Sequence, residues 1–218
     1  RYPSAADERA AIETIAAAHG RRTDEVLLLS GAAEGFELLP RLDPRHAALI
    51  EPSFTEPAVV LRASGIRTTP VVLEPPFRLD ASAAVPDDAD LVVLGNPTNP
   101  TSVLHAAPDI LALRRPGRLI VVDEAFADLT LDPVTGHREP ESLAGLQLPD
   151  VIVLRSITKT FALAGLRVGY LLAAPDIIAR LSRGRRPWSV GTLGLTALTA
   201  CVGPRGQAHC DAEAVRVA

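Results

Sequence analysis

Lys159 is the only lysine among 218 residues, and the other 21 Lys or Arg positions are all arginine. Arginine stays protonated at every accessible pH, so Lys159 carries the only side-chain amine able to attack a carbonyl and bind it covalently. Ser156, Thr158 and Arg167 lie nearby in the sequence, and hydroxyls with a fixed cation suit a phosphate. The stretch therefore predicts a reactive amine beside an anion site, with a solvated surface lysine as the plainer alternative.

Further candidate positions follow short apolar segments elsewhere in the chain. They are Gly31, Ala32, Ala33 and Glu34 after residues 26–30, Phe54 after 47–50, Asn99 after 91–94 and Asp123 after 119–122. Each also has a structural explanation, because Asn-Pro pairs and glycine make turns, Asp caps helices and Phe is commonly core. Their shared position after strands, together with a single lysine, favours one common site.

One cofactor, pyridoxal phosphate, accounts for all of these residue types. Its aldehyde needs Lys159, and its ring nitrogen needs a fixed carboxylate such as Asp123. Its ring oxygen needs a donor such as the Asn99 amide, and its ring needs a stacking face such as Phe54. Its phosphate needs backbone N–H groups at a helix start, which residues 31–33 offer, in addition to the hydroxyls and Arg167.

Short apolar segments alternate with helical ones along the chain, a pattern that predicts an α/β fold. We expect a mostly parallel seven-stranded sheet with helices on both faces, and ligands at the carboxyl ends of its strands. The strands are expected at 26–30, 47–50, 66–73, 91–94, 119–122, 151–154 and 168–173. The helices are expected at 5–19 (with Ser4 as its cap), 31–39, 56–63, 108–114 and 175–183, with another beginning at 190–202.

Composition limits the class of protein. With 47% hydrophobic and 22% charged residues the chain reads as globular, and its net charge of −4 does not favour a nucleic-acid-binding surface. No apolar run approaches the roughly 20 residues of a membrane span. Cys201 and Cys210 are too few for a disulfide framework, which favours reduced thiols and a cytoplasmic location. No metal site is expected, and the absence of Met predicts that this sequence is a piece of a longer protein.

Together the motifs resemble the class I/II aminotransferases, pyridoxal-phosphate enzymes of fold type I. The resemblance is strongest to the branch containing histidinol-phosphate aminotransferase and threonine-phosphate decarboxylase. In that branch a Ser/Thr-x-x-Lys run is followed eight positions later by a phosphate-binding Arg, as are Ser156, Lys159 and Arg167 here. Residues 99–102 resemble the branch's Asn-Pro-Thr-Gly, with Ser in place of Gly, and residues 123–126 resemble its Asp-Glu-Ala-Tyr/Phe.

The resemblance implies roles and partners for the chain. Lys159 and Asp123 would be catalytic, residues 31–34 would form the phosphate turn, and Tyr2 would reach the phosphate in a neighbouring subunit. It therefore implies a homodimer with shared active sites that acts on a small amino-acid substrate. Residues 1–186 would form the cofactor-binding large domain. Residues 187–218 would begin a linker helix toward a small C-terminal domain that this chain lacks.

Two departures bear on the reaction. Phe126 stands where many relatives carry a Tyr that bonds the ring oxygen, and Pro187–Val190 looks more like the threonine-phosphate decarboxylases. Both favour threonine-phosphate decarboxylation in cobalamin biosynthesis, with a histidinol-phosphate-type transamination as the alternative. A non-catalytic large domain used for binding or assembly is the alternative from another class. A nucleotide-binding domain is disfavoured, because no Gly-x-Gly-x-x-Gly or P-loop run follows a strand.

Overall fold

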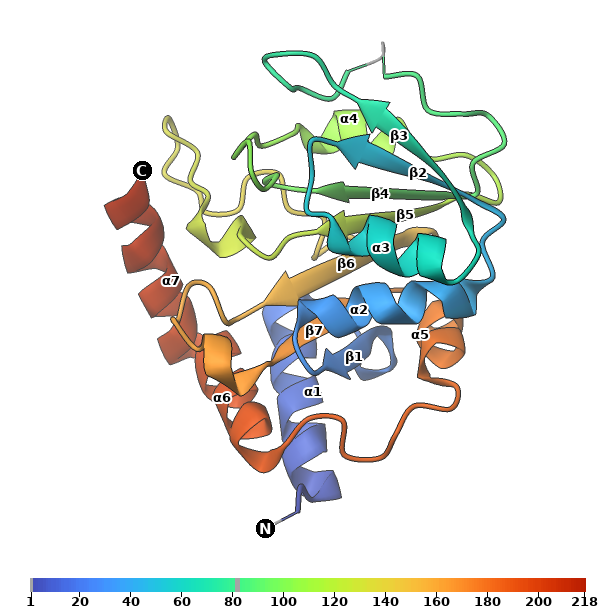
Figure 1. Ribbon diagram of the computed structural model, residues 1–218. Coiled ribbons are helices and arrows are strands. Elements are labelled where there is room, and N and C mark those ends of the chain that lie inside the picture. Colours follow the sequence, from blue (N-terminus) through green and yellow to red (C-terminus); the bar gives the residue numbers. More distant parts are fainter. Residues whose placement is uncertain (1, 81–82) are drawn as a thin grey trace.

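Seven strands pair into one sheet in the order β1-β7-β6-β5-β4-β2-β3 (Figure 1). The computed structural model describes residues 2–80 and 83–218. Strands β2 to β6 run parallel to one another, whereas β7 is antiparallel to both β6 and β1. This confirms the expected mostly parallel sheet. The strands are β1 Val26–Leu29, β2 His46–Glu51, β3 Arg67–Val72, β4 Leu91–Gly95, β5 Leu119–Asp123, β6 Val151–Ser156 and β7 Gly169–Leu172.

Helices cover both faces of this sheet. One apolar cluster packs α2, α3 and α5 on the face turned to the viewer in Figure 1, and a second packs α1, α4 and α6 on the other. The helices are α1 Ala5–His19, α2 Ala32–Leu38, α3 Glu56–Ala63, α4 Ala107–Leu111, α5 Pro175–Ser182, α6 Thr192–Val202 and α7 Pro204–Val217. Short 3-10 turns are η1 Thr23–Glu25, η2 Leu39–Leu42, η3 Ala127–Leu129 and η4 Ala164–Leu166.

The pleat of the central strands decides which residues face which layer. In β5, Val121 packs in the cluster with α2 and α3, whereas Ile120 and Val122 pack in the cluster with α1 and α6. Successive strand residues point to opposite faces. Asp123 therefore points to the α2 side, and Glu124 points to the α1 side. The residues of β6 alternate in the same way, so its last two residues, Arg155 and Ser156, point to opposite sides of the sheet.

The N-terminal helix begins as its sequence indicates. Ser4 Oγ accepts from the Asp7 backbone N at 3.1 Å, and Asp7 Oδ2 accepts from the Ser4 backbone N at 3.1 Å. This reciprocal capping box satisfies two backbone donors that a helix start leaves free. Gly20 ends the helix in the left-handed conformation with φ +61°, which glycine adopts without strain.

The C-terminal segment contains two helices where the sequence indicated only the start of one. The chain forms two helices, α6 and α7, separated at Gly203, because Pro204 has no backbone N–H and Gly203 is extended. A Cβ at Gly206 would lie 1.8 Å from Cys201 O, so the two helices meet closely. The boundary at residue 186 stays a prediction. Among the described residues, no helix has the length and apolarity needed to cross a membrane.

Candidate active site

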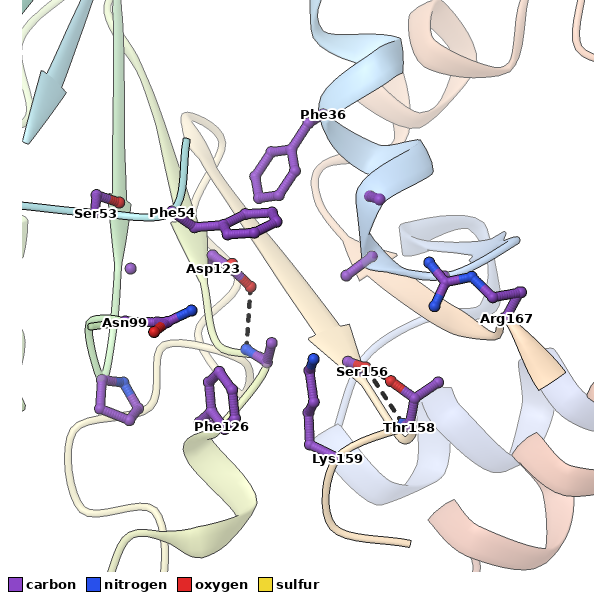
Figure 2. Close-up of a pocket in the computed structure, with 16 residues that line it drawn as sticks. Phe36, Ser53, Phe54, Asn99, Asp123, Phe126, Ser156, Thr158, Lys159 and Arg167 are labelled. Carbon is purple, nitrogen blue, oxygen red and sulfur yellow. Dashed lines mark hydrogen bonds between the residues drawn. The ribbon is translucent and has the colours of Figure 1, made fainter. Parts of the chain in front are cut away.

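A pocket enclosing about 690 Å³ of space, part of it open to solvent, lies where β4, β5 and β6 end and α2 begins (Figure 2). The parallel strands bring their carboxyl ends to this one edge, so residues distant in sequence meet there. The sequence-predicted residues that line the pocket are Gly31, Ala32, Ala33, Phe54, Asn99, Asp123, Ser156, Thr158, Lys159 and Arg167. Glu34 and Tyr2 do not line it.

Asp123 presents a poorly satisfied carboxylate to the pocket. Its Oδ1 accepts a hydrogen bond from the Ala125 backbone N at 3.1 Å. Burial raises the pKa of Asp123 to about 6; the Ala125 hydrogen bond opposes this shift and the neighbouring Glu124 charge adds to it. No cationic side chain among the described residues forms an ion pair with Asp123. A positively charged group entering the pocket would meet a carboxylate already in place.

Lys159 projects into the pocket from the turn after β6 (Figure 2). Its Nζ lies 5.4 Å from the centroid of the Phe126 ring, within the range of a cation–π contact. Phe126 follows β5, so the ends of two neighbouring strands hold the amine from two sides. Phe126 has no hydroxyl, so it donates no hydrogen bond to the pocket. Lys159 forms no ion pair within the described part of the chain, which leaves its amine accessible.

Hydroxyls and a guanidinium gather on the β6 and α2 side of the pocket. Ser156 Oγ and Thr158 Oγ1 are buried and lie 2.8 Å apart. Arg167 Nη1 donates to Ala164 O at 3.4 Å, and Arg167 forms no ion pair with any described carboxylate. Two hydroxyls and an arginine whose donors are largely free match what a phosphate group accepts.

Two glycines, Gly31 and Gly169, allow the backbone at the start of α2 to lie close to Arg167 and to β6. Gly31 has φ +85°, and a Cβ there would come within 3.0 Å of Arg167 Nη2. In β7, a Cβ on Gly169 would lie 2.6 Å from Arg155 O and 3.1 Å from Ala32 N. A side chain at either position would displace the start of α2 or Arg167, so glycine is needed at both.

Phe54 lies over the pocket near Asp123 (Figure 2) and packs against Phe36 of α2, with ring centroids 6.3 Å apart. Phe36 is buried and therefore fixes Phe54, which is 41% exposed. Sequence reasoning missed Phe36 as a pocket residue, although it lies five positions after Gly31 on the helix predicted to hold the phosphate. It likewise missed the small or backbone-lining residues Ser53, Gly95, Pro97 and Ala125.

Asn99 is held at the rim by a buried polar network beneath its loop. His105 N donates to Asn96 Oδ1 at 2.7 Å, and Asn96 Nδ2 donates to His105 O at 3.1 Å. Leu79 N donates to His105 Nδ1, so Nε2 carries the proton and donates to Thr98 Oγ1 at 3.1 Å. Burial lowers the pKa of His105, in keeping with this neutral form. The network fixes the loop that carries the exposed Asn99 side chain.

Glu34 and Tyr2 have other surroundings. The Glu34 carboxylate lies on the outer side of α2, where it pairs with Arg185 at 2.7 Å and accepts from the Ser30 backbone N at 2.6 Å. Its role here is to hold the start of α2 rather than to line the pocket. Tyr2 is 78% exposed and stacks on Trp188 with ring centroids 5.1 Å apart, outside the pocket of its own chain.

Metal ligands are not gathered in the described part of the chain. No group of three or more His, Cys, Asp or Glu side chains there has an arrangement that could hold a metal ion. The pocket residues themselves offer an amine, a carboxylate, hydroxyls and a guanidinium.

Comparison with known proteins gives one consistent family. The family described as aminotransferase class I and II matches residues 1–216. A histidinol-phosphate aminotransferase of Mycobacterium tuberculosis is 60% identical over 217 residues, covering the whole of this chain and 58% of the relative. A threonine-phosphate decarboxylase of a Sinorhizobium species is 37% identical, covering 83% of this chain and 53% of the relative. The chain thus spans little more than half the length of these two relatives.

A solved structure shares the fold. The structure of histidinol-phosphate aminotransferase from Sinorhizobium meliloti in complex with pyridoxal-5'-phosphate superposes with a TM-score of 0.84 at 20% identity, covering 99% of this chain and 59% of that one. Among the curated relatives, the higher identity is to the aminotransferase rather than to the decarboxylase. This finding runs against the preference for decarboxylation drawn from Phe126 and residues 187–190.

Proposed function

Because the chain belongs to the class I and II aminotransferase family, we propose that it is the cofactor-binding part of a pyridoxal-phosphate enzyme. The observation that carries the proposal is that the only lysine of the chain points into a pocket shared with Asp123 and Arg167. These three residues supply an amine, an anion and a cation. They come from two strand ends and from the segment before a third strand. A lysine that served only as a solvated surface residue would not be expected to point into a pocket with both groups.

The residues present fit this cofactor. A ring cation would compensate the Asp123 carboxylate, whose pKa burial raises to about 6. Arg167, Ser156, Thr158 and the backbone N–H groups after Gly31 would hold the phosphate. When bound, pyridoxal phosphate supplies an aldehyde for amines and a ring that stabilises negative charge at a substrate α-carbon. We assign Asp123 and Lys159 as catalytic residues.

The remaining pocket residues orient and shield the site. Phe54 would cover one face of the ring, fixed in place by Phe36, and Asn99 would donate to the ring oxygen from its rigid loop. Lys159 Nζ, once free and uncharged, would accept the proton lost from the substrate α-carbon and return it to a neighbouring atom. Phe126 supports Lys159 through its ring and excludes water from one side of the amine.

We propose transamination of a phosphorylated amine of the histidinol-phosphate type as the reaction of the whole protein. The support is the 60% identity to a histidinol-phosphate aminotransferase across this chain. Decarboxylation of threonine phosphate is the second candidate, favoured by Phe126, which withholds a hydroxyl donor from the ring oxygen. Incubation of the native protein with histidinol phosphate and a 2-oxo acid, or with threonine phosphate alone, separates the two. Amino transfer supports the first candidate, and release of carbon dioxide supports the second.

Covalent trapping tests the site itself. Borohydride reduction of the protein with pyridoxal phosphate is expected to fix one cofactor per chain at Lys159, identified by peptide mapping. Lys159→Arg keeps the positive charge but cannot form the bond, so it is the matched control. Equal labelling of wild type and Lys159→Arg, with the label on the N-terminal amine, would refute the assignment.

We further propose that the functional unit is a homodimer in which Tyr2 contacts the phosphate in the partner's site. The support is the position of Tyr2, which is exposed and far from the pocket of its own chain. An interface that shares two equivalent sites must be isologous. Sedimentation of the native protein at micromolar concentration is expected to give a dimer. A monomer that still retains cofactor tightly would contradict the shared site.

A further inference from the structure

On the side of the sheet opposite the pocket, the Arg155 side chain is enclosed by three carboxylates. Its Nη1 donates to Glu124 Oε2 at 2.9 Å and to Glu139 Oε2 at 2.7 Å, and its Nη2 donates to Asp128 Oδ1 at 2.5 Å. Arg155 is 3% exposed and Glu124 is 1% exposed. We call Arg155 with these three acids the Arg155 cluster.

Members of the Arg155 cluster adjoin pocket residues along the chain. Glu124 directly follows Asp123, and Asp128 lies two positions after Phe126. Arg155 directly precedes Ser156. Because consecutive strand residues face opposite sides, the pairs Asp123–Glu124 and Arg155–Ser156 each put one group in the pocket and its neighbour in the cluster.

The cluster ties the segment after β5 to the segment after β6. Glu124 N donates to Leu154 O at 2.9 Å, which continues the parallel ladder by one residue beyond β5. Thr160, next to Lys159, donates to Asp128 Oδ2 at 3.4 Å. Hydrogen bonds from Arg155 span the same two segments. These contacts on the far side of the sheet join the two segments that carry Asp123 and Lys159.

Residues 139–143 complete the enclosure of Glu124. Ser142 Oγ donates to Glu124 Oε2 at 2.6 Å, and Leu143 N donates to Glu124 Oε1 at 2.7 Å. Arg138 joins at the edge, where it pairs with Glu139, lies 3.6 Å from Asp128 and pairs with Asp211 of α7 at 2.8 Å. Within the described residues, no hydrogen bond or ion pair joins Arg138 to Glu124 or to a residue of β5 or β6, which makes it a natural control.

Stability alone does not account for the Arg155 cluster. A buried ion network recovers little more than its desolvation cost, and apolar residues of similar volume often stabilise as well or better. Such a network constrains geometry, because a planar guanidinium holds several acids in fixed relative positions. Catalytic geometry is sensitive to displacements of about 1 Å.

We propose that Arg155 is a positioning residue, which fixes Asp123 and Lys159 relative to each other by holding Glu124, Asp128 and Glu139 behind the ends of β5 and β6. The inference rests on the proposed cofactor site. It adds to that site a support on the opposite face of the sheet, which the pocket residues do not include.

The test compares Arg155→Lys with Arg138→Lys in the full native chain. Each variant keeps a positive charge beside Asp128 and Glu139, but only Arg155→Lys loses the planar guanidinium between the strand ends. Arg155→Lys is expected to weaken pyridoxal-phosphate binding about tenfold and to lower turnover about 100-fold, with Arg138→Lys within about threefold of wild type. Equal losses in both variants would overturn the proposal.

A second measurement needs no bound cofactor and serves if Arg155→Lys does not fold. Glu124→Gln keeps the shape of the side chain and its acceptor for Leu143 N. The Glu124 charge raises the pKa of Asp123, so the Asp123 pKa, followed by carbon NMR of the cofactor-free protein, is expected to fall in this variant. An unchanged Asp123 pKa would show that the cluster and the pocket carboxylate are independent.

Failure of the inference differs from failure of the proposed function. If borohydride labels Lys159 in wild type but Arg155→Lys binds cofactor as Arg138→Lys does, the site stands and the positioning role is overturned. If Lys159 is not labelled in wild type, the proposed function itself fails.

Discussion

On the pocket side of β5 and β6, Asp123 and Arg167 carry charges without ion-pair partners among the described residues, whereas on the opposite side Arg155 contacts three carboxylates. The two sides are built from neighbouring residues of the same strands, as Asp123 and Glu124 show. The difference indicates where a ligand is needed. Unmatched charges of both signs in one pocket suit a ligand carrying a cation and an anion.

The pKa values of the carboxylates differ most between Asp123 in the pocket and Glu139 on the opposite side. Burial raises the pKa of Asp123 to about 6, because the Ala125 hydrogen bond and the Lys159 charge offset the loss of solvation only in part. Burial also disfavours the ionised form of Glu139, but Arg155 and Arg138 outweigh it and lower the pKa of Glu139 to about 2. Burial raises the pKa of Glu124 and Asp128 in spite of Arg155, so Glu139 is the acid whose charge the arginines favour most. A cation bound in the pocket would likewise favour the charge of Asp123.

The largest effect is expected from removing the charge of the pocket carboxylate. Asp123→Asn keeps the shape but no longer favours a ring cation, so turnover is expected to fall by orders of magnitude, equivalent to several kcal/mol of transition-state stabilisation. Steady-state kinetics of the native protein measures it. Turnover within about tenfold of wild type would remove Asp123 from the catalytic residues.

Next in size is the loss of the central cation on the opposite side. Arg155→Met removes the cation that three buried acids share. Among the described residues, it leaves Glu124 without an ion pair and leaves Asp128 and Glu139 with Arg138 alone, so it is expected to cost about 3–5 kcal/mol of unfolding free energy. The matched control is Arg114→Met, because Arg114 pairs with Asp150 at 2.9 Å in a partly exposed position, where such pairs contribute about 1 kcal/mol or less. Urea unfolding measures the unfolding free energy of both variants. Equal losses would show that the Arg155 cluster contributes no more than an ion pair at the surface.

Asp123→Asn, although it is expected to lower turnover, is expected to stabilise the cofactor-free protein. Because the folded pKa of Asp123 is raised from 3.8 to about 6, stability from this group is present below pH 4 and is lost as pH rises through 6. Asn cannot ionise, so the variant is expected to be more stable than wild type at pH 7 by about 1–3 kcal/mol, and equal near pH 3. Thermal unfolding across pH gives the answer; a variant less stable at pH 7 would contradict the uncompensated charge.

The smallest effect is expected at Arg167. Arg167→Lys keeps the charge but cannot donate two parallel N–H bonds to a phosphate, so cofactor affinity is expected to fall about tenfold, or 1.4 kcal/mol. Thermal stability should change little, because Arg167 forms no ion pair within the described residues. Titration with pyridoxal phosphate measures the affinity. Unchanged affinity would make Arg167 a structural residue.

Much of the fold followed from local pattern. Apolar runs such as residues 119–122 predicted strands because a strand buried on both faces needs them, and breaks at Gly and Pro marked their ends. The seven strands and the mostly parallel sheet are confirmed, with ends shifted by one or two residues. The separation of α6 from α7 at Gly203 was not predicted, although Pro204 carries the signal.

The sequence by itself determined the chemistry available in the pocket. One lysine, a carboxylate at a strand end and hydroxyls beside an arginine are matters of residue type and spacing, and parallel strands bring their ends together whatever the loops do. Only the tertiary structure decided how those groups are held. Glu34 turns outward to Arg185, and Arg155 faces Glu124, Asp128 and Glu139. Both arrangements depend on strand register and on segments that are far apart in the chain. Sequence places acids and arginines near one another without saying which side of the sheet each occupies, because a shift of one residue reverses every side chain.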